Sequence, residues 1–93
     1  MRSSFDFIAD PGHGWLKVTV QDLAALKLSP TDFSTYSYRN KNALYLEEDN
    51  DAGIFANAWI AANPGKEMKF RERVARERQS RVRNYARNTY NGV

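Results

Sequence analysis

Apolar and polar residues alternate over four short stretches in the first half of the chain, as they do in β-strands that bury one face. The stretches are residues 5–9, 15–20, 35–39 and 43–47. Turn-forming residues join the first pair at positions 10–14 and the second pair at positions 40–42. Each pair therefore predicts a β-hairpin.

Two other stretches place apolar residues three and four positions apart, which predicts helices. The first is a short helix over residues 20–27, with Thr19 as its N-cap and Asp22 where an acidic side chain closes a capping box. Pro30 and its neighbours stop this helix, because the residue before a proline avoids the helical region.

A longer helix is predicted over residues 52–62, with Asp49, Asn50 or Asp51 as its cap. Its core-facing residues are expected to be Ile54, Phe55, Ala58, Trp59 and Ala62. The order of elements predicts an α+β fold, in which two β-hairpins form a small antiparallel sheet packed by this main helix. Residues 1–65 would form that body, and residues 66–93 an arginine-rich C-terminal helix or tail of the same domain.

Residues 66–93 differ from the rest of the chain in charge. They contain nine Lys and Arg against three Glu, a net charge of +6, whereas residues 1–65 carry a net charge of −3. Within residues 66–87 each Glu has an Arg four positions later, the orientation that stabilises a helix. No Gly or Pro interrupts this run, so the pattern predicts a basic helix.

A helix over residues 66–87 would gather most of its cations on one stripe. The stripe contains Lys69, Arg73, Arg76, Arg83 and Arg87, our candidate residues for binding nucleic acid or another acidic partner. Two alternatives stay open. Mixed Arg and Glu are common on the solvated face of a helix. The alternation of Met68 and Phe70 with charged residues also fits an edge strand over residues 67–72, which would remove Lys69 from the stripe.

The composition excludes several classes of site. The chain has no cysteine and one histidine, His13, so disulfides, thiolate metal sites and cysteine nucleophiles are ruled out, and a zinc site would lack ligands. No stretch approaches the roughly 20 apolar residues of a transmembrane helix, and the first residues lack a signal-peptide pattern. We therefore expect a soluble, cytoplasmic protein without a metal or cofactor.

His13 lies in a glycine-flanked turn three residues after Asp10. A catalytic role would require a nucleophile or carboxylate close to it in space. The interpretation that we prefer is that Asp10 and His13 stabilise a tight turn through side-chain hydrogen bonds.

Acidic residues follow the last predicted strand. They are Glu47, Glu48, Asp49 and Asp51, which we regard as possible contacts for a protein partner. Their spacing does not match an EF-hand loop, and helix capping accounts for part of the cluster. A patch that mimics the phosphates of a nucleic acid is a third interpretation.

Aromatic residues recur on the predicted strands. Trp15, Tyr36, Tyr38 and Tyr45 could together offer a sheet face on which single-stranded bases stack. Aromatic residues at strand spacing are more often part of a core or of cross-strand pairs, and a helix covering that face would exclude base stacking.

Three parts of the chain together resemble a group of short, uncharacterised proteins carried by bacteriophages, prophages and plasmids. They are residues 10–16 (DPGHGWL), 36–38 (YSY) and 45–52 (YLEEDNDA). The resemblance covers most of residues 5–62 and brings no catalytic role with it. It implies the bacterial cytoplasm and a mobile-element origin, and small proteins of that origin often inhibit host systems such as CRISPR and restriction defences.

Together these patterns predict a small non-enzymatic binding or regulatory protein, anti-CRISPR-like, that engages nucleic acid or a nucleoprotein complex through a basic helix. The alternative is a protein–protein inhibitor of a host enzyme, with charge complementarity supplied by the acidic loop and the basic helix. A small hydrolase or nuclease that uses His13 is a further alternative, although no recognisable catalytic constellation is present.

Overall fold

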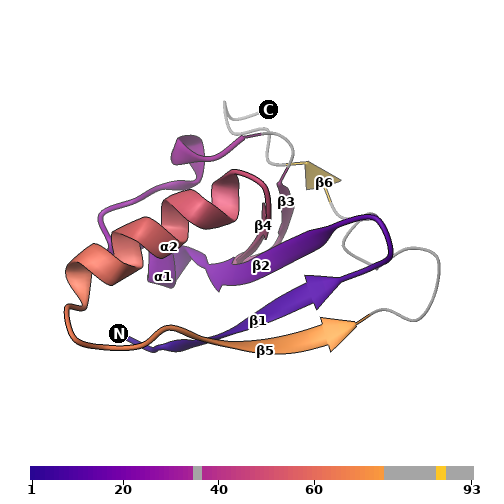
Figure 1. The fold of residues 1–93 in the computed structure, drawn as a ribbon. Helices are drawn as coiled ribbons and strands as arrows, with labels where there is room; N and C mark the ends of the chain where they lie inside the picture. Colours follow the sequence, from indigo (N-terminus) through magenta and orange to yellow (C-terminus); the bar gives the residue numbers. More distant parts are fainter. Residues whose placement is uncertain (35–36, 75–85, 88–93) are drawn as a thin grey trace.

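The first predicted hairpin is present at the start of the chain. Strands β1 (Ser4–Ala9) and β2 (Gly14–Thr19) pair antiparallel, with Phe7 opposite Leu16. The turn between them closes with a hydrogen bond from the Asp10 N–H to the carbonyl of His13, 2.8 Å long. The structure, a computed structural model, describes residues 1–34, 37–74 and 86–87 (Figure 1).

The second hairpin is also present, and its first strand begins later than predicted. Strand β3 (Tyr38–Asn40) pairs antiparallel with β4 (Ala43–Glu47), and Lys41 in the tight turn between them has a positive φ of 57°. Strand β4 also pairs antiparallel with β2, placing Leu46 opposite Leu16. The two hairpins therefore form one continuous sheet.

A parallel strand makes this sheet mixed. Strand β5 (Lys69–Val74) runs parallel to β1, and the two-residue β6 (Ala86–Arg87) pairs with β3, giving the order β5-β1-β2-β4-β3-β6. The α+β class is thus confirmed, whereas the prediction of a wholly antiparallel sheet is wrong. Figure 1 shows β5 at one edge of the sheet, beside β1.

The predicted C-terminal helix is wrong over Lys69–Val74 and at Ala86–Arg87, because both segments are strands. The alternative of an edge strand near residues 67–72 is confirmed, two residues further along. Each i,i+4 pair contributes only about 0.2–0.5 kcal/mol to a helix, and every residue of β5 has a partner on β1 instead. Residues 66–68 are not helical either, and residues 75–85 of the predicted helix lie outside the described residues.

Helix α1 (Val20–Ala25) begins as predicted, with Thr19 as its N-cap. The Asp22 N–H donates to the Thr19 hydroxyl oxygen (3.1 Å), and the Thr19 N–H donates to the Asp22 carboxylate (2.8 Å), which closes a capping box. The helix is two residues shorter than predicted. A single 3₁₀ turn follows at Pro30–Asp32.

The Asp22 carboxylate also holds the start of the chain. The Arg2 guanidinium donates two hydrogen bonds to it, of 3.1 and 2.7 Å. Burial by itself raises the pKa of the Asp22 carboxyl, but the Arg2 guanidinium and the hydrogen bonds from Thr19 outweigh burial and bring this pKa below its ordinary value.

Helix α2 (Asp51–Ala62) lies across one face of the sheet (Figure 1). Its N-cap is Asn50, one of the three predicted candidates, although the Asn50 side chain makes no capping hydrogen bond. Phe55 and Trp59 face the core and are wholly buried, as predicted. Ile54 is instead 37 % exposed, and Ala62 and Ala58 are exposed and half-buried respectively.

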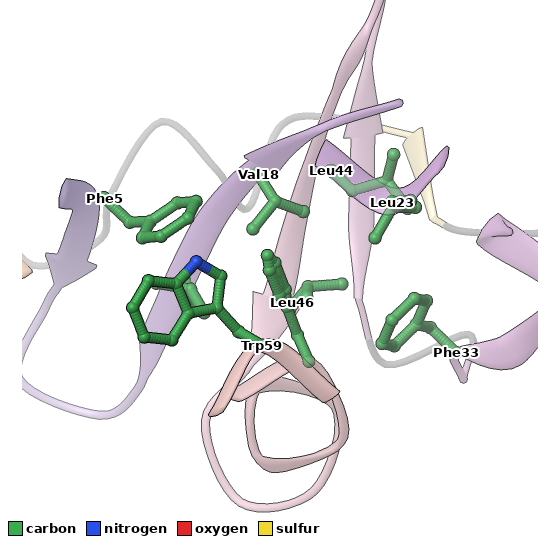
Figure 2. Close-up of a cluster of buried hydrophobic side chains, with 9 residues drawn as sticks. Phe5, Val18, Leu23, Phe33, Leu44, Leu46 and Trp59 are labelled. Atoms are coloured by element: carbon green, nitrogen blue, oxygen red, sulfur yellow. The ribbon is translucent and has the colours of Figure 1, made fainter. Parts of the chain in front are cut away.

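The core fills the space between α2 and the sheet (Figure 2). Strand residues point toward the helix and meet Trp59, while Leu23 of α1 and Phe33 close one end. The rings of Phe5 and Phe55 pack edge to face, with centroids 5.3 Å apart, and the Trp59 indole N–H donates to the Arg2 carbonyl at 3.0 Å. The first residues of the chain are thereby fixed to the core.

No helix in the part of the chain that the structure describes is long and apolar enough to cross a membrane.

Candidate functional site

Strand β5 is the element on which the candidate site is built. Its register with β1 sets Arg71 beside Asp6 and Arg73 beside Ile8. Because side chains alternate along a strand, Lys69, Arg71 and Arg73 project from the face of the sheet opposite α2, and Phe70 and Glu72 project from the α2 side. The strand therefore presents three cations on one face of the sheet, and Phe70 with Glu72 on the other.

The charged side of β5 is exposed and strongly basic. The Arg71 and Arg73 side chains are 59 % and 67 % exposed, and Lys69 is exposed as well. Lys17 on β2 lies on the same face, since it pairs with Asp6 as Arg71 does. We call Lys17, Lys69, Arg71 and Arg73 the basic row.

One carboxylate lies among these cations. The Asp6 side chain is 18 % exposed, and its two oxygens lie 2.9 Å from Arg71 Nε and 3.5 Å from Arg73 Nε. Asp6 is therefore the ion-pair partner of both guanidinium groups. It cancels one of the four positive charges, so the basic row keeps a surplus of three.

A groove lies on the other side of β5, against the first turns of α2. It encloses about 430 Å³ and is lined by Phe7, Leu16, Ala52, Gly53, Ala56, Phe70 and Glu72. Of the described residues that line it, Glu72 alone is charged. Phe70 is 53 % exposed, and a Cβ atom built on Gly53 would meet nothing within 4 Å. We call this feature the apolar groove.

The structure separates the residues of the predicted basic stripe. Lys69 and Arg73 lie together on β5, whereas Arg87 lies on β6 at the opposite edge of the sheet, with its Cα opposite that of Tyr38. Arg76 and Arg83 fall outside the described residues. A single helical stripe of five cations is therefore wrong, and Arg71 takes the place between Lys69 and Arg73.

Two of the four acidic residues proposed as partner contacts are used within the fold. The Glu47 carboxylate accepts hydrogen bonds from the N–H groups of Asp49 (2.9 Å) and Asn50 (3.3 Å). Asp51 is wholly buried and accepts from Ser34 and Ser37. Glu48 and Asp49 remain exposed. No group of three or more His, Cys, Asp or Glu within the described residues could hold a metal ion.

His13 lies in the β1–β2 turn, and its side chain is exposed. One Asp10 carboxylate oxygen accepts hydrogen bonds from the N–H groups of Gly12 (3.0 Å) and His13 (2.9 Å). The Asp10 side chain therefore stabilises the turn, as predicted. The His13 ring lies 6.0 Å from that of Trp15, centroid to centroid. The Asp10 carboxylate thus bonds to the backbone of the turn.

Three aromatic residues of β2, β3 and β4 gather on the face of the sheet opposite α2, as the alternation along each strand requires. Trp15 and Tyr38 pack edge to face, 6.0 Å apart, and Tyr45 joins them. All three are buried, with at most 8 % of each residue exposed, so they form a second small cluster rather than an open platform for bases. Tyr36 lies outside the described residues.

Sequence reasoning missed three residues of this surface: Lys17, Arg71 and the exposed Phe70. The alternation of residues 67–71 was the signal for Arg71 and Phe70, and the pairing of β1 with β2 was the signal for Lys17. Comparison of the chain with models of protein families, with curated proteins and with solved structures gives no match.

Proposed function

We propose that this chain is a non-enzymatic binding protein whose partner is an acidic protein, held at β5. The observation that supports this most directly is the composition of the β5 edge. Cations project from one side of the strand, and an exposed Phe70 beside the apolar groove lies on the other. A charged row and an apolar groove on one element suit a protein surface, which offers both kinds of side chain.

The basic row accounts for the charge of the partner. Exposed ion pairs contribute little to affinity singly, but they steer association and select a partner of opposite charge. Asp6 forms ion pairs with Arg71 and Arg73, which offsets part of the repulsion between these neighbouring cations.

Nucleic acid is the second candidate partner, favoured by the net charge of +6 on residues 66–93. Phosphate contacts need only cations within reach and no base readout. The burial of Trp15, Tyr38 and Tyr45 speaks against base stacking on the sheet. Binding of this kind would be sequence-independent and would fall steeply with salt.

The context that we propose is the cytoplasm of a bacterial host. It rests on the resemblance of residues 10–16, 36–38 and 45–52 to short proteins of bacteriophages, prophages and plasmids. In that setting a small charged binding protein would inhibit a host enzyme or defence complex, as an anti-CRISPR protein does, by occupying a surface rather than by catalysis.

A pair of charge-reversal variants tests the proposed site. Lys69→Glu with Arg73→Glu reverses two cations of the basic row. Lys27→Glu with Lys41→Glu changes the net charge equally at two exposed loop positions away from it. Each protein is used as bait in nuclease-treated bacterial lysate, and bound proteins are identified and then purified for direct titration.

We expect a protein partner that the wild type and the loop variant retain after nuclease treatment and that the basic-row variant loses. Retention that depends on intact nucleic acid, together with direct binding of DNA or RNA, would favour the second candidate. Equal retention by both variants would contradict the assignment of the site to β5.

A further inference from the structure

Within the part of the chain that the structure describes, one edge of the β5 backbone has no neighbouring strand. Among the described residues, β5 pairs with β1 alone. The Lys69 N–H donates to the Ser3 carbonyl at 2.7 Å, so Lys69 directs its backbone groups toward β1. Backbone direction alternates along a strand, and Phe70 and Glu72 therefore direct their N–H and C=O groups outward.

We propose that β5 is an acceptor for strand addition by an extended acidic segment of a partner protein, in which acidic and apolar side chains alternate. This proposal rests on the proposed function and specifies how the partner binds. An added strand would take its main-chain hydrogen bonds from Phe70 and Glu72 and place alternate side chains on the two faces of the sheet.

Charge determines what can add to this edge. Side chains directly opposite each other on one face are neighbours, and like charges there are destabilising. The face opposite α2 presents Lys69, Arg71 and Arg73, so the facing residues of the added strand must be acidic. Its other residues would lie beside Phe70 and the apolar groove, where apolar side chains gain by burial.

A second copy of the chain does not meet these requirements. Two-fold antiparallel pairing of β5 with itself keeps each face on the same side, so basic residues meet basic residues. The register centred on Arg71 sets Arg71 against Arg71 and Lys69 against Arg73. In the register centred on Phe70, Lys69 faces Arg71, and in the register centred on Glu72, Arg71 faces Arg73. Within β5, self-pairing therefore sets cation against cation in each of these three registers.

Protection against aggregation does not account for the whole edge. Charged residues on an edge strand do prevent unwanted pairing, and the three cations have that effect against a second copy. A protected edge has no need of Phe70, which is 53 % exposed beside a groove that no side chain of the described residues fills. The basic row on one side of β5 and the apolar groove on the other together favour one class of strand, in which acidic and apolar side chains alternate.

Fluorescence anisotropy with synthetic peptides tests the proposal. The probe is a labelled peptide of about eight residues that alternates Glu with Val or Leu, long enough to span the six residues of β5. A peptide of identical composition with its Glu residues in one block is the first control. Two further peptides carry backbone N-methyl groups, one on the Glu residues and one on the apolar residues. A DNA oligonucleotide is titrated in parallel.

The alternating peptide should bind at least about tenfold more tightly than the block peptide, and Lys69→Glu with Arg73→Glu should weaken it by about tenfold, whereas Lys27→Glu with Lys41→Glu should not. One methylated peptide should lose binding and the other should keep it. If N-methylation of the apolar residues abolishes binding, the peptide adds antiparallel to β5, and if N-methylation of the Glu residues abolishes binding, it adds parallel.

Equal binding of the alternating, block and methylated peptides would overturn strand addition and leave a charge-driven protein site standing. Tighter binding of DNA, sensitive to the basic-row variant, would overturn it in favour of nucleic acid. Binding that is the same for the wild type and both variants would overturn the proposed function itself.

Discussion

Substitution of Asp51 should destabilise the fold more than substitution at most other positions. Its wholly buried carboxylate joins Ser34 and Ser37 to the start of α2. One carboxylate oxygen accepts hydrogen bonds from the Ser34 N–H (2.9 Å), the Ser34 hydroxyl (2.7 Å) and the Ser37 hydroxyl (2.5 Å). The Ser37 oxygen in turn accepts from the Glu47 N–H at 2.9 Å. Truncating Asp51 therefore leaves several donors without their acceptor.

The magnitude follows from these contacts. A hydrogen bond to a charged group contributes about 1.5–3 kcal/mol, and a stranded buried donor costs about as much. The backbone fixes the direction of the Ser34 N–H, whereas the two hydroxyls can rotate toward another acceptor. We therefore expect Asp51→Ala to lower the free energy of unfolding by about 3 kcal/mol, a large share of the roughly 5–14 kcal/mol expected for a chain of this length.

Urea denaturation followed by circular dichroism is the assay. With an m-value of about 1.5 kcal/mol/M, the midpoint should fall by about 2 M. Asp32→Ala is the matched control. The Asp32 carboxylate accepts the exposed Ser29 N–H at 2.8 Å, and losing such a cap costs only about 1 kcal/mol. A loss for Asp51→Ala no larger than for Asp32→Ala would refute the reasoning.

Three further changes have expected outcomes. The folded-state pKa of Asp22 lies below its ordinary 3.8, so the stability that this carboxylate contributes is present above about pH 4 and is lost as the pH falls through the lowered pKa. In Arg2→Met, the free energy of unfolding measured in urea should therefore fall less steeply between about pH 5 and 2 than in the wild type. A Cβ at Gly14 would lie 2.5 Å from Phe7 Cζ, so Gly14→Ala should lower the free energy of unfolding by about 1–3 kcal/mol, read as a lower urea midpoint; an unchanged midpoint would show that the Phe7 ring moves aside freely. Trp59→Phe loses the 3.0 Å hydrogen bond to the Arg2 carbonyl and part of the core volume, and should reduce thermal stability by about 1–2 kcal/mol, more than Ile60→Ala on the exposed side of α2.

Local patterns were enough to predict most of the fold. The period of two placed β1, β2 and β4 within one or two residues. The capping-box spacing of Thr19 and Asp22 fixed the start of α1 because the two hydrogen bonds involve only adjacent backbone. Phe55 and Trp59 were predicted as core residues because they are one turn apart on α2. Ile54, predicted beside them, lies toward the rim of the helix and remains partly exposed.

The predictions from sequence failed where the local structure depends on a residue or strand far away in the chain. Residues 69–74 have good helical ion pairs and also alternate, so local propensity does not choose between helix and strand. The free edge of β1, more than 60 residues earlier in the chain, decides for a strand. Asp51 was predicted only as one of three alternative helix caps and as a possible partner contact, because nothing near it in the sequence indicates that Ser34 and Ser37 donate hydrogen bonds to it.

The candidate site was predicted in part for the same reason. Lys69 and Arg73 were predicted as members of a helical stripe. They remain on one side of the element because both a helix and a strand place residues four apart on the same side. Arg71 was not part of the predicted helical stripe, and it lies between them in the strand. The apolar groove could not be predicted, because it forms only where β5 and α2 meet.

The most direct test of the account is amide hydrogen exchange of β5, measured by NMR with and without the alternating acidic peptide. The N–H groups of Phe70 and Glu72 face outward and should become strongly protected when the peptide binds. The N–H of Lys69 already donates to Ser3 and should change little. Peptide binding that leaves the exchange of Phe70 and Glu72 unchanged, or protects a different part of the chain, would contradict the claim that β5 accepts a partner strand.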